Sequence, residues 1–482
     1  MEWLRRWAVE RPSALFLNEW TYGDVYEATI AVATYLQEAL DGQRRVALRA
    51  ENSVAMAVTL FAALLCGKEV LTINTHLTAG EVADQMQTLE ITSLLTVAGD
   101  VPWNGIEDIS AMGLHSLHIT VPTRSSKAAE KRNALTAAGG KAVMPNSPAN
   151  TSFGWQPDDK AIAVIMNTSA TTGRFKSVPI RWGQIRAHVA ASAEVIGVEA
   201  EDNWLVVLPM FHVSGLSIIL RTLYNGTAAT IMRKYEEGPV LKVIGAGKVN
   251  MISLVPTILQ RIIEAVPAHG LRMILLGGEF IPQPLIKRCL EKRLPVYKTY
   301  GMTESFAQSA TFNILAYPHK LAAVGKPLPG VTITVKNQDS HGVGDIWIQS
   351  PMLMTGYLGK KPLSPEGLNT DDIGYIDEDG FLYLLNRRKD IIISGGENIY
   401  PKELEDTLYE LDGLEECAVI PVADAHWGQV PALFYAGTVA PEAVRDFLAN
   451  RLARYKLPKY IRQIASLPKN ASGKVLRGEL HL

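Results

Sequence analysis

The chain has 482 residues, of which 47% are hydrophobic and 20% charged, as in a globular protein with room for about three domain-sized units. Lys and Arg number 47 against 49 for Asp and Glu, so the net charge of −2 lacks the basic excess of nucleic-acid binders and polybasic membrane-surface proteins. The longest apolar stretch, residues 54–67, is shorter than the roughly 20 residues of a membrane-spanning helix. We therefore expect no nucleic-acid partner and no stable membrane insertion.

The three cysteines predict a reducing compartment. Cys66, Cys289 and Cys417 lie far apart without C-x-x-C spacing, which suggests neither a disulfide framework nor a zinc site. Residues 1–12 interrupt their apolar positions with charges and lack the apolar core of a signal peptide. The sequence therefore predicts a cytoplasmic protein. It leaves the oligomeric state open, a homo-oligomer included.

Short β-type runs alternate with helix-like segments from about residue 44 to 300. Several of these runs are nearly continuous in apolar residues, as in strands that are buried on both faces. The runs cover 44–50, 69–74, 93–98, 116–121, 161–167, 204–209, 228–233, 251–256, 271–277 and 295–301. Segments 54–67 and 255–266 between them have helical character. This alternation predicts parallel sheets with helices packed outside and ligands bound at the carboxyl ends of the strands.

The pattern changes after about residue 325. Runs 330–337, 344–351 and 380–386 predict short antiparallel strands, and a mixed region from about 390 predicts a helix over 401–411, strands over 416–423 and 432–437, and a helix within 441–458. The polar stretch 122–158 is interpreted as a mobile surface excursion. The predicted class is α/β, with a large N-terminal domain of parallel sheets, a small β-rich subdomain and a small α+β C-terminal domain.

A loop rich in Ser and Thr follows the predicted strand 161–166. It runs from Thr168 to Gly173, and the cations Arg174 and Lys176 come directly after it. Hydroxyls and backbone N–H groups of such a loop can surround phosphate oxygens, whose charge nearby cations offset. The Walker A pattern is absent, and by itself this run is more simply interpreted as a polar surface turn.

Four further sequence patterns follow the Ser/Thr loop along the chain. They are Leu276-Gly277-Gly278-Glu279, Tyr300-Gly301-Met302-Thr303-Glu304, the run 369–374 with 386–390, and the run 467–475 that contains Lys474. Together with the Ser/Thr loop they resemble the adenylate-forming superfamily, which includes acyl-CoA synthetases, peptide-synthetase adenylation domains and luciferases. The resemblance is strongest from about residue 160 onward. The chain departs from the usual pattern at Ala170, Phe175, Ser177, Asp371 and Asn386.

The resemblance implies that ATP and Mg²⁺ bind at these patterns. Tyr300 would stack on adenine, Asp372 and Arg387 would bind the ribose, and Glu304 would hold Mg²⁺, which prefers hard oxygen ligands. The full implied nucleotide site comprises Thr168, Ser169, Thr171, Thr172, Gly173, Lys176, Gly277, Gly278, Glu279, Tyr300, Gly301, Met302, Thr303, Glu304, Asp372, Arg387 and Lys474.

A mobile C-terminal domain is implied by the same resemblance. A lysine on a Gly/Ser turn is ordinarily only solvated, but Lys474 would reach the reacting carboxylate and the α-phosphate, where a fixed cation stabilises growing negative charge. The domain would then turn about Lys389 and place Ser394, Gly395 and Gly396 along a tunnel for coenzyme A. The implied domains are 1–387, with a β-rich part over about 325–387, and 388–482.

Two residues are candidates for binding the acid. His212 follows the strand 204–209 and is either a core histidine or a group beside the acyl carboxylate. Arg221 lies in an apolar helical run, where it forms a salt bridge, snorkels to the surface, or binds a second carboxylate with its guanidinium. The implied acyl site consists of His212, Arg221, Gly277 and Thr303, and the implied catalytic residues are Lys474, Thr303 and His212.

The predicted activity is an ATP-dependent acid–CoA ligase that forms an acyl-adenylate and then an acyl-CoA. Its partners would be small molecules: the acid, ATP and coenzyme A. The sequence leaves open a ligase for an aromatic or medium-chain acid, a stand-alone adenylation domain that loads a carrier protein, and a nucleotide-binding protein that has lost catalysis.

Overall fold

The computed structural model describes residues 1–100, 103, 105–121, 158–168, 175–267, 270–387, 390–394, 397–469 and 475–482, with the backbone alone at 387, 397 and 398. The polar stretch 122–158 therefore lies outside the described residues, except for its last position. Within the described part, no helix has the length and apolar character needed to cross a membrane.

The largest sheet has nine strands and is mainly parallel. Its order is β15 (Lys326–Pro327), β14 (Ala307–Asn313), β13 (Val296–Met302), β12 (Met273–Leu276), β11 (Met251–Leu254), β9 (Asn203–Val206), β10 (Ala228–Ile231), β1 (Leu15–Leu17) and β2 (Trp20–Thr21). Strands β13 to β1 pair in parallel, while β14, β15 and β2 are antiparallel.

A second sheet has six strands in the order β6 (His115–Ile119), β5 (Ser93–Val97), β3 (Arg45–Leu48), β4 (Glu69–Thr72), β7 (Ile162–Thr168) and β8 (Lys176–Arg181). All of its pairs are parallel except β7 with β8. The inner strands β4 and β5 are buried along their whole length, which is why apolar residues are adjacent in them, Val70 with Leu71 and Leu94 with Leu95, rather than alternating with polar ones. Each predicted run between 44 and 300 overlaps a strand, and the prediction of parallel sheets is confirmed.

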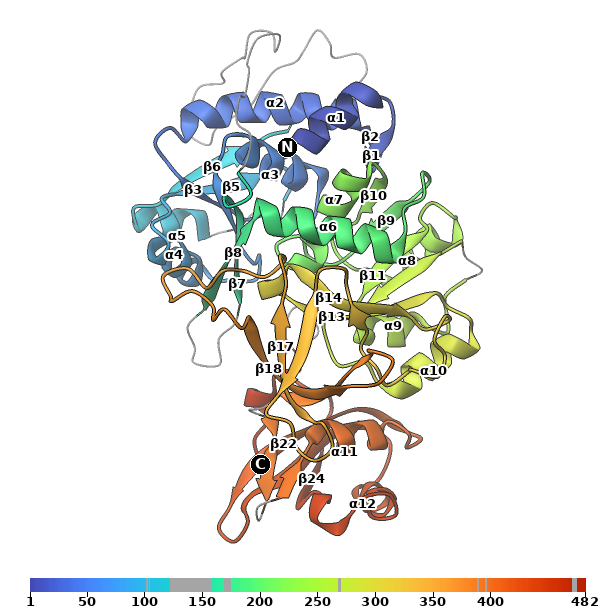
Figure 1. The fold of residues 1–482 in the computed structure, drawn as a ribbon. Coiled ribbons are helices and arrows are strands. Elements are labelled where there is room, and N and C mark those ends of the chain that lie inside the picture. Colours follow the sequence, from blue (N-terminus) through green and yellow to red (C-terminus); the bar gives the residue numbers. More distant parts are fainter. Residues whose placement is uncertain are drawn as a thin grey trace.

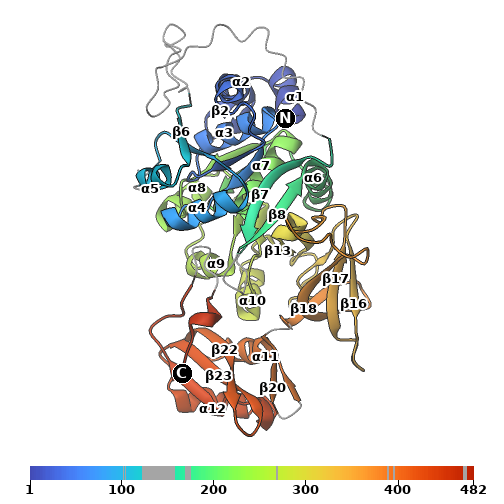
Figure 2. The ribbon, with the colours of Figure 1, turned by 90° about the vertical axis from the view of Figure 1, so that its left-hand side faces the viewer.

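Helices pack around both sheets (Figures 1 and 2). They are α1 (Glu2–Glu10), α2 (Tyr22–Ala39), α3 (Val54–Leu65), α4 (Ala79–Thr88), α5 (Gly105–Ala111), α6 (Trp182–Ile196), α7 (Val213–Asn225), α8 (Glu237–Gly245), α9 (Pro256–Ile262) and α10 (Gln283–Glu291). The largest core combines side chains from the two sheets, such as Val70 and Val206, with helical ones such as Phe61 and Trp182. Helix α3 is apolar almost all round and accordingly buried on nearly every face.

Two smaller sheets follow. The antiparallel one contains β16 (Thr332–Lys336), β17 (Gly344–Gln349), β18 (Leu368–Ile376) and β19 (Leu382–Arg387). The last contains β21 (Glu397–Ile399), β20 (Ile392–Ser394), β23 (Gly428–Gly437), β22 (Leu414–Asp424) and β24 (Tyr460–Gln463), packed with α11 (Pro401–Leu408) and α12 (Pro441–Ala449). These C-terminal elements form a separate layer at one end of the molecule, opposite α1 and α2 (Figures 1 and 2).

The structure differs from the predicted elements at several places. Strands β8, β14 and β18 were not predicted, because their polar residues hide the strand pattern. The run 369–374, which reads as a turn, lies on β18, where Asp371 has a positive φ of 60°. Helix α11 ends at Leu408 rather than residue 411, and α12 covers only 441–449 of the predicted range. The domain boundary at 387/388 stays a prediction.

Among the described glycines, Gly301 leaves the least room for a side chain, so its substitution tests the fold directly. An added Cβ would stand 1.4 Å from the carbonyl oxygen of Ala307, at the register shift between β13 and β14. We expect Gly301→Ala to lower the free energy of unfolding by roughly 1–3 kcal/mol or more, measured by urea denaturation. Gly80→Ala is the control, because nothing lies within 4 Å of its Cβ; equal stability of the two variants would contradict this account.

Candidate active site

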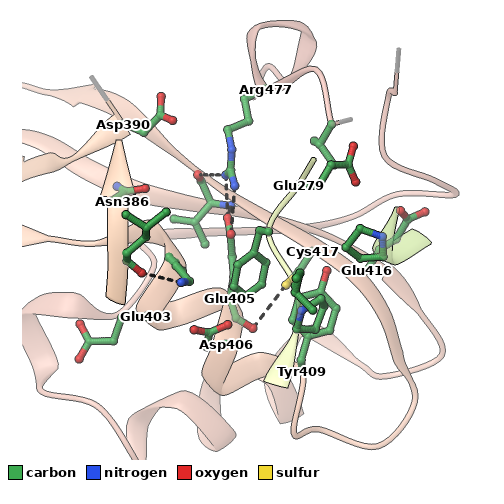
Figure 3. A pocket seen from close by; sticks show the side chains of 18 of the residues that line it. Glu279, Asn386, Asp390, Glu403, Glu405, Asp406, Tyr409, Glu416, Cys417 and Arg477 are labelled. Carbon is green, nitrogen blue, oxygen red and sulfur yellow. Dashed lines mark hydrogen bonds and ion pairs between the residues drawn. The ribbon is translucent and has the colours of Figure 1, made fainter. Parts of the chain in front are cut away.

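A cavity of about 1710 Å³ lies between the carboxyl ends of the parallel strands and the C-terminal elements. From the N-terminal side its lining includes five of the predicted residues: Gly278, Glu279, Tyr300, Gly301 and Asp372. From the C-terminal side it includes Lys469, Val475 and Arg477, which flank the predicted Lys474 in the sequence. Figure 3 shows Arg477 and Glu279 among the residues that line the cavity. The structure therefore brings patterns that are far apart in the sequence to one place.

The nucleoside part of the predicted site is built on two sheets. The hydroxyl of Tyr300 on β13 donates a hydrogen bond of 2.5 Å to Oδ2 of Asp372 on β18. Asp372 is only 6% exposed and pairs with position 387 of β19. An aromatic face and a buried carboxylate thus meet at the cavity wall, which suits a flat base joined to a hydroxylated sugar.

Two glycines follow β12, and the first of them allows the backbone there to lie close to β13. A Cβ on Gly277 would stand 2.5 Å from Cγ2 of Thr299, and Gly278 has a φ of +86°, which L side chains rarely adopt. Both positions therefore require glycine for a steric reason that is independent of any ligand. Gly277 itself is buried, whereas Gly278 is exposed.

Glu304 and Lys176 lie around one tyrosine. The hydroxyl of Tyr357 donates a hydrogen bond of 2.8 Å to Oε1 of Glu304, and Nζ of Lys176 is 5.1 Å from the centroid of the same ring. Burial, followed by the charge of Glu304, raises the pKa of Tyr357 above its usual value, so the phenol stays protonated and remains a donor. Thr303 and Glu304 belong to the short 3-10 helix Thr303–Ser305 that follows β13.

The donor set around Glu304 fits magnesium only as an ion shared with phosphates. No group of three His, Cys, Asp or Glu side chains that could hold a metal is found among the described residues. One oxygen of Glu304 accepts the Tyr357 hydrogen bond, and a single carboxylate is a weak site by itself. Magnesium usually binds through one or two carboxylates together with substrate phosphates and water, which this arrangement allows.

The base of the Ser/Thr loop is a β-hairpin. Thr168, the last residue of β7, donates its hydroxyl to the carbonyl of Lys176 at 3.3 Å, and Ser177 donates to Oδ1 of Asn167 at 2.7 Å. Ser177 replaces the glycine of the usual pattern, and its buried hydroxyl has a partner within the hairpin. This departure is therefore accommodated at the base of the loop.

His212 is the N-cap residue of α7. Its side chain makes no capping hydrogen bond, and burial, followed by the nearby His76, lowers its pKa to about 4. Asn52 holds the segment before it, by accepting from the N–H of Met210 at 2.7 Å and donating to the carbonyl of Leu208 at 2.9 Å. At neutral pH the imidazole is therefore uncharged and acts as a hydrogen-bonding group rather than as a cation.

Arg221 is buried on α7, with 2% exposure. Its Nη2 donates to Oε1 of Gln308 at 2.8 Å and lies 3.3 Å from Nε2 of His188, and its guanidinium carbon is 5.2 Å from the Trp204 ring centroid. The N–H of Gln308 also points to Nε2 of His188, so this ring nitrogen accepts and the imidazole is neutral. Burial lowers the pKa of Arg221 to about 9, which leaves it charged at neutral pH.

The simpler interpretations of Arg221 are that it forms a salt bridge or that its side chain snorkels to the surface. In the described structure it does neither. Within the described part of the chain no carboxylate pairs with it, and its Nε has no hydrogen-bond partner. A buried cation with a donor to spare is costly without an anion, which is the arrangement expected where a ligand supplies one.

Several predicted residues lie outside the described part of the chain: Ser169, Thr171, Thr172, Gly173, Lys389, Gly395, Gly396 and Lys474. Arg387 is described by its backbone alone, on β19, and Ser394 ends β20. Their predicted contacts, like the roles of the residues described above, stay predictions.

Comparison with known proteins identifies the family of this chain. The family "AMP-binding enzyme" matches residues 3–358, and "AMP-binding enzyme C-terminal domain" matches residues 403–474. The chain belongs to the AMP-binding enzymes. This confirms the predicted adenylate-forming fold, with a large N-terminal α/β domain and a small C-terminal domain.

Individual AMP-binding enzymes match over the whole chain. The 2-succinylbenzoate–CoA ligase of Lactococcus lactis subsp. lactis is 52% identical over 480 residues, which cover 100% of both chains. The o-succinylbenzoate CoA synthetase of Bacillus subtilis, solved with the acyl-adenylate intermediate OSB-AMP, has a TM-score of 0.84 at 30% identity and covers 99% of this chain and 97% of its own. Its complex with ATP and magnesium ion has the same TM-score and identity, with 99% and 98% covered.

Some residues of the site were missed in the sequence. Tyr357 follows no recognisable pattern, and Gln308 and His188 lie on β14 and α6, far from Arg221 along the chain. Glu405 could have been noticed, because it is an acid directly beside the apolar positions Leu404 and Leu408 of an amphipathic helix.

The low pKa of His212 predicts a pH effect on stability. Between pH 6.5 and 4 the unfolded ring takes up a proton that the folded ring does not, so lowering the pH through this window favours unfolding. We expect the stability of the wild type to fall relative to that of His212→Asn as the pH drops from 6.5 to 4, measured by urea denaturation. His115→Asn, at an exposed site, controls for loss of one imidazole. Parallel stability curves for the wild type and His212→Asn would contradict the assigned burial effect.

Proposed function

We propose that this chain is an AMP-forming 2-succinylbenzoate–CoA ligase of menaquinone biosynthesis. It would activate the succinyl carboxylate as an acyl-adenylate and then transfer the acyl group to coenzyme A, releasing AMP. The observation that carries this proposal is the convergence of Tyr300, Asp372, Gly278 and Glu279 around one cavity in a chain that aligns fully with ligases of that name. The motifs quoted above also resemble those of o-succinylbenzoate–CoA ligases.

The first half-reaction brings a carboxylate to the α-phosphate of ATP, so the protein must offset charge between two anions. Lys176 would neutralise the triphosphate near the Ser/Thr loop, and Lys474 would reach the centre under attack. Glu304 would hold magnesium, which supplies positive charge against the phosphates when bound. Thr303 would donate a hydrogen bond near the α-phosphate. Fixed charges and donors in a site closed to water stabilise the developing charge without reorganisation.

The acid would lie between His212 and Arg221. A neutral His212 can hydrogen-bond the carboxylate that reacts without forming an ion pair that would weaken its nucleophilicity. The benzoate carboxylate would be held by Arg221, directly or through water, because Nε of that buried guanidinium is still a free donor within the described structure. Gly277 and Thr303 would complete the acyl site.

The second half-reaction needs a different set of residues. Turning about Lys389 would bring Ser394, Gly395 and Gly396 to the site and leave a narrow passage for the pantetheine of coenzyme A. Because the thiol of coenzyme A is the nucleophile, no cysteine of the chain is required. The cysteines without pairing spacing support a cytoplasmic location, and assembly into a homo-oligomer stays open.

A panel of acids tests the substrate. Purified protein with Mg·ATP and coenzyme A should release AMP with o-succinylbenzoate far faster than with benzoate or medium-chain fatty acids. Comparable rates would make it a ligase for another acid, and AMP release that requires an added carrier protein would make it a stand-alone adenylation domain. If no acid supports exchange of labelled pyrophosphate into ATP, the chain is not an adenylate-forming enzyme.

Substitution of Lys474 tests the division between the two half-reactions. We expect Lys474→Ala to lower pyrophosphate–ATP exchange by roughly two to three orders of magnitude, because the cation at the reacting centre is lost. Thioester formation from preformed acyl-adenylate should be largely preserved, since that step uses the other domain orientation. Equal impairment of both steps would contradict the alternation of the C-terminal domain.

A further inference from the structure

The backbone on the two sides of residues 470–474 is fixed together. Lys469 and Val475 form an isolated antiparallel bridge, and the N–H of Leu476 donates to the carbonyl of Pro468 at 2.8 Å. Lys474 comes directly before this closed base. Because Lys474 is bonded to Val475, a displacement of Val475 and Leu476 also displaces the backbone attachment of Lys474.

An ion pair with a buried carboxylate attaches the second side of this base to helix α11. Arg477 donates from Nη1 to Oε1 of Glu405 at 2.6 Å and from Nη2 to Oε2 at 3.0 Å, so both oxygens of the carboxylate are engaged. Glu405 is 2% exposed, and its Oε1 also accepts from the N–H of Val419 at 2.7 Å. Nη1 of Arg477 donates in addition to the carbonyl of Val419 at 2.8 Å. Two-point charge-assisted contacts of this kind fix direction as well as distance (Figure 3).

The residues that precede 470–474, Leu467 and Lys469, are attached to strand β22. Nζ of Lys469 forms an ion pair with Glu416 on β22, and the N–H of Leu467 lies 3.4 Å from the other oxygen of the same carboxylate. In this pair 24% of the Lys469 side chain and 21% of Glu416 are accessible, whereas in the other pair 32% of Arg477 but only 3% of Glu405 is accessible. The attachment to α11 therefore differs in that its carboxylate is buried and less screened by water.

Helix α11 also contacts the nucleotide side of the cavity. Nζ of Lys402 donates to the carbonyl of Leu384 at 2.5 Å and lies 4.9 Å from the ring centroid of Phe280, the residue after Glu279. The Phe280 ring is also 6.4 Å from that of Tyr409, at the end of the same helix. The helix thus touches the 277–280 segment on one side and Arg477 on another.

We propose that Glu405 and Arg477 are positioning residues for the adenylation half-reaction. Their ion pair attaches residues 475–477, which directly follow Lys474, to helix α11, and this helix contacts the 277–280 segment. This inference depends on the proposed function, in which Lys474 acts only in adenylation. A pair that merely stabilised the C-terminal domain would affect both half-reactions equally. A pair that aims Lys474 affects adenylation alone.

The test measures the half-reactions separately in full-length variants. Glu405→Gln removes the charge with little change of shape, and Arg477→Lys keeps the charge but loses the two-point geometry. We expect both to lower the maximal rate of pyrophosphate–ATP exchange by about 100-fold, the cost of misplacing a reacting group by about 1 Å. The rate of thioester formation from preformed acyl-adenylate should stay within about twofold of the wild type on the same argument, since it does not use Lys474.

Glu403→Gln is the matched control, with the same substitution two residues away on the same helix. Its carboxylate pairs with Lys456 at 2.6 and 2.8 Å, so it removes an ion pair of α11 that does not lead to the 475–477 segment. We expect it to leave both rates within about twofold of the wild type. A thermal-unfolding scan of each variant shows whether the C-terminal domain stays folded.

The outcomes distinguish a failure of this inference from a failure of the proposed function. If the wild type exchanges pyrophosphate and Lys474→Ala abolishes that exchange, the proposed function stands. Full exchange activity in Glu405→Gln and Arg477→Lys would then overturn the positioning role alone, as would equal losses in both half-reactions. If Glu405→Gln unfolds, Arg477→Lys decides. If the wild type itself shows no exchange with any acid, the failure lies with the proposed function.

Discussion

The hydrogen bond between Tyr300 and Asp372 joins two sheets, which also meet at the bridge between Gly325 and Leu382. Tyr300 lies near the end of β13 in the parallel sheet, and Asp372 lies in the antiparallel sheet, 72 residues later. Neither sheet alone would present an aromatic face next to a buried carboxylate. The contact depends on Gly277 and Gly301, because a side chain at either position would push β13 away from its neighbours. The geometry of the cavity is therefore set by backbone packing before any ligand is considered.

Charge is the second constraint on this site. In the proposed function, a triphosphate and a carboxylate together carry far more negative charge than could be offset by Lys176, whose Nζ lies 5.1 Å from the Tyr357 ring centroid. Arg221 belongs to a buried network with Gln308 and His188 instead. In the proposed function, further positive charge would come from magnesium and from Lys474 of the C-terminal part, whose residues Lys469 and Arg477 line the cavity.

The strands and the principal motifs could be predicted because their signals are local. Buried parallel strands give continuous apolar runs, and glycines at positions such as 277 and 301 mark close backbone contacts. The strand β18 could not be predicted, because Asp371 and Asp372 give it the polarity of a turn. Residues such as Tyr357 and Gln308 could not be found either, since their importance lies in partners about 50 to 90 positions away.

Helix α11 shows how a short amphipathic segment can serve several contacts at once. Helical spacing turns Leu404 and Leu408 into the core and leaves Lys402 and Tyr409 for Phe280. Glu405 lies next to the apolar face, where a carboxylate is costly unless it is fully paired. Both of its oxygens are paired with the Arg477 guanidinium, and one accepts a backbone N–H as well. An acid in so buried a position constrains the direction of its partner more than a leucine there would, because charge and fork geometry allow only one arrangement.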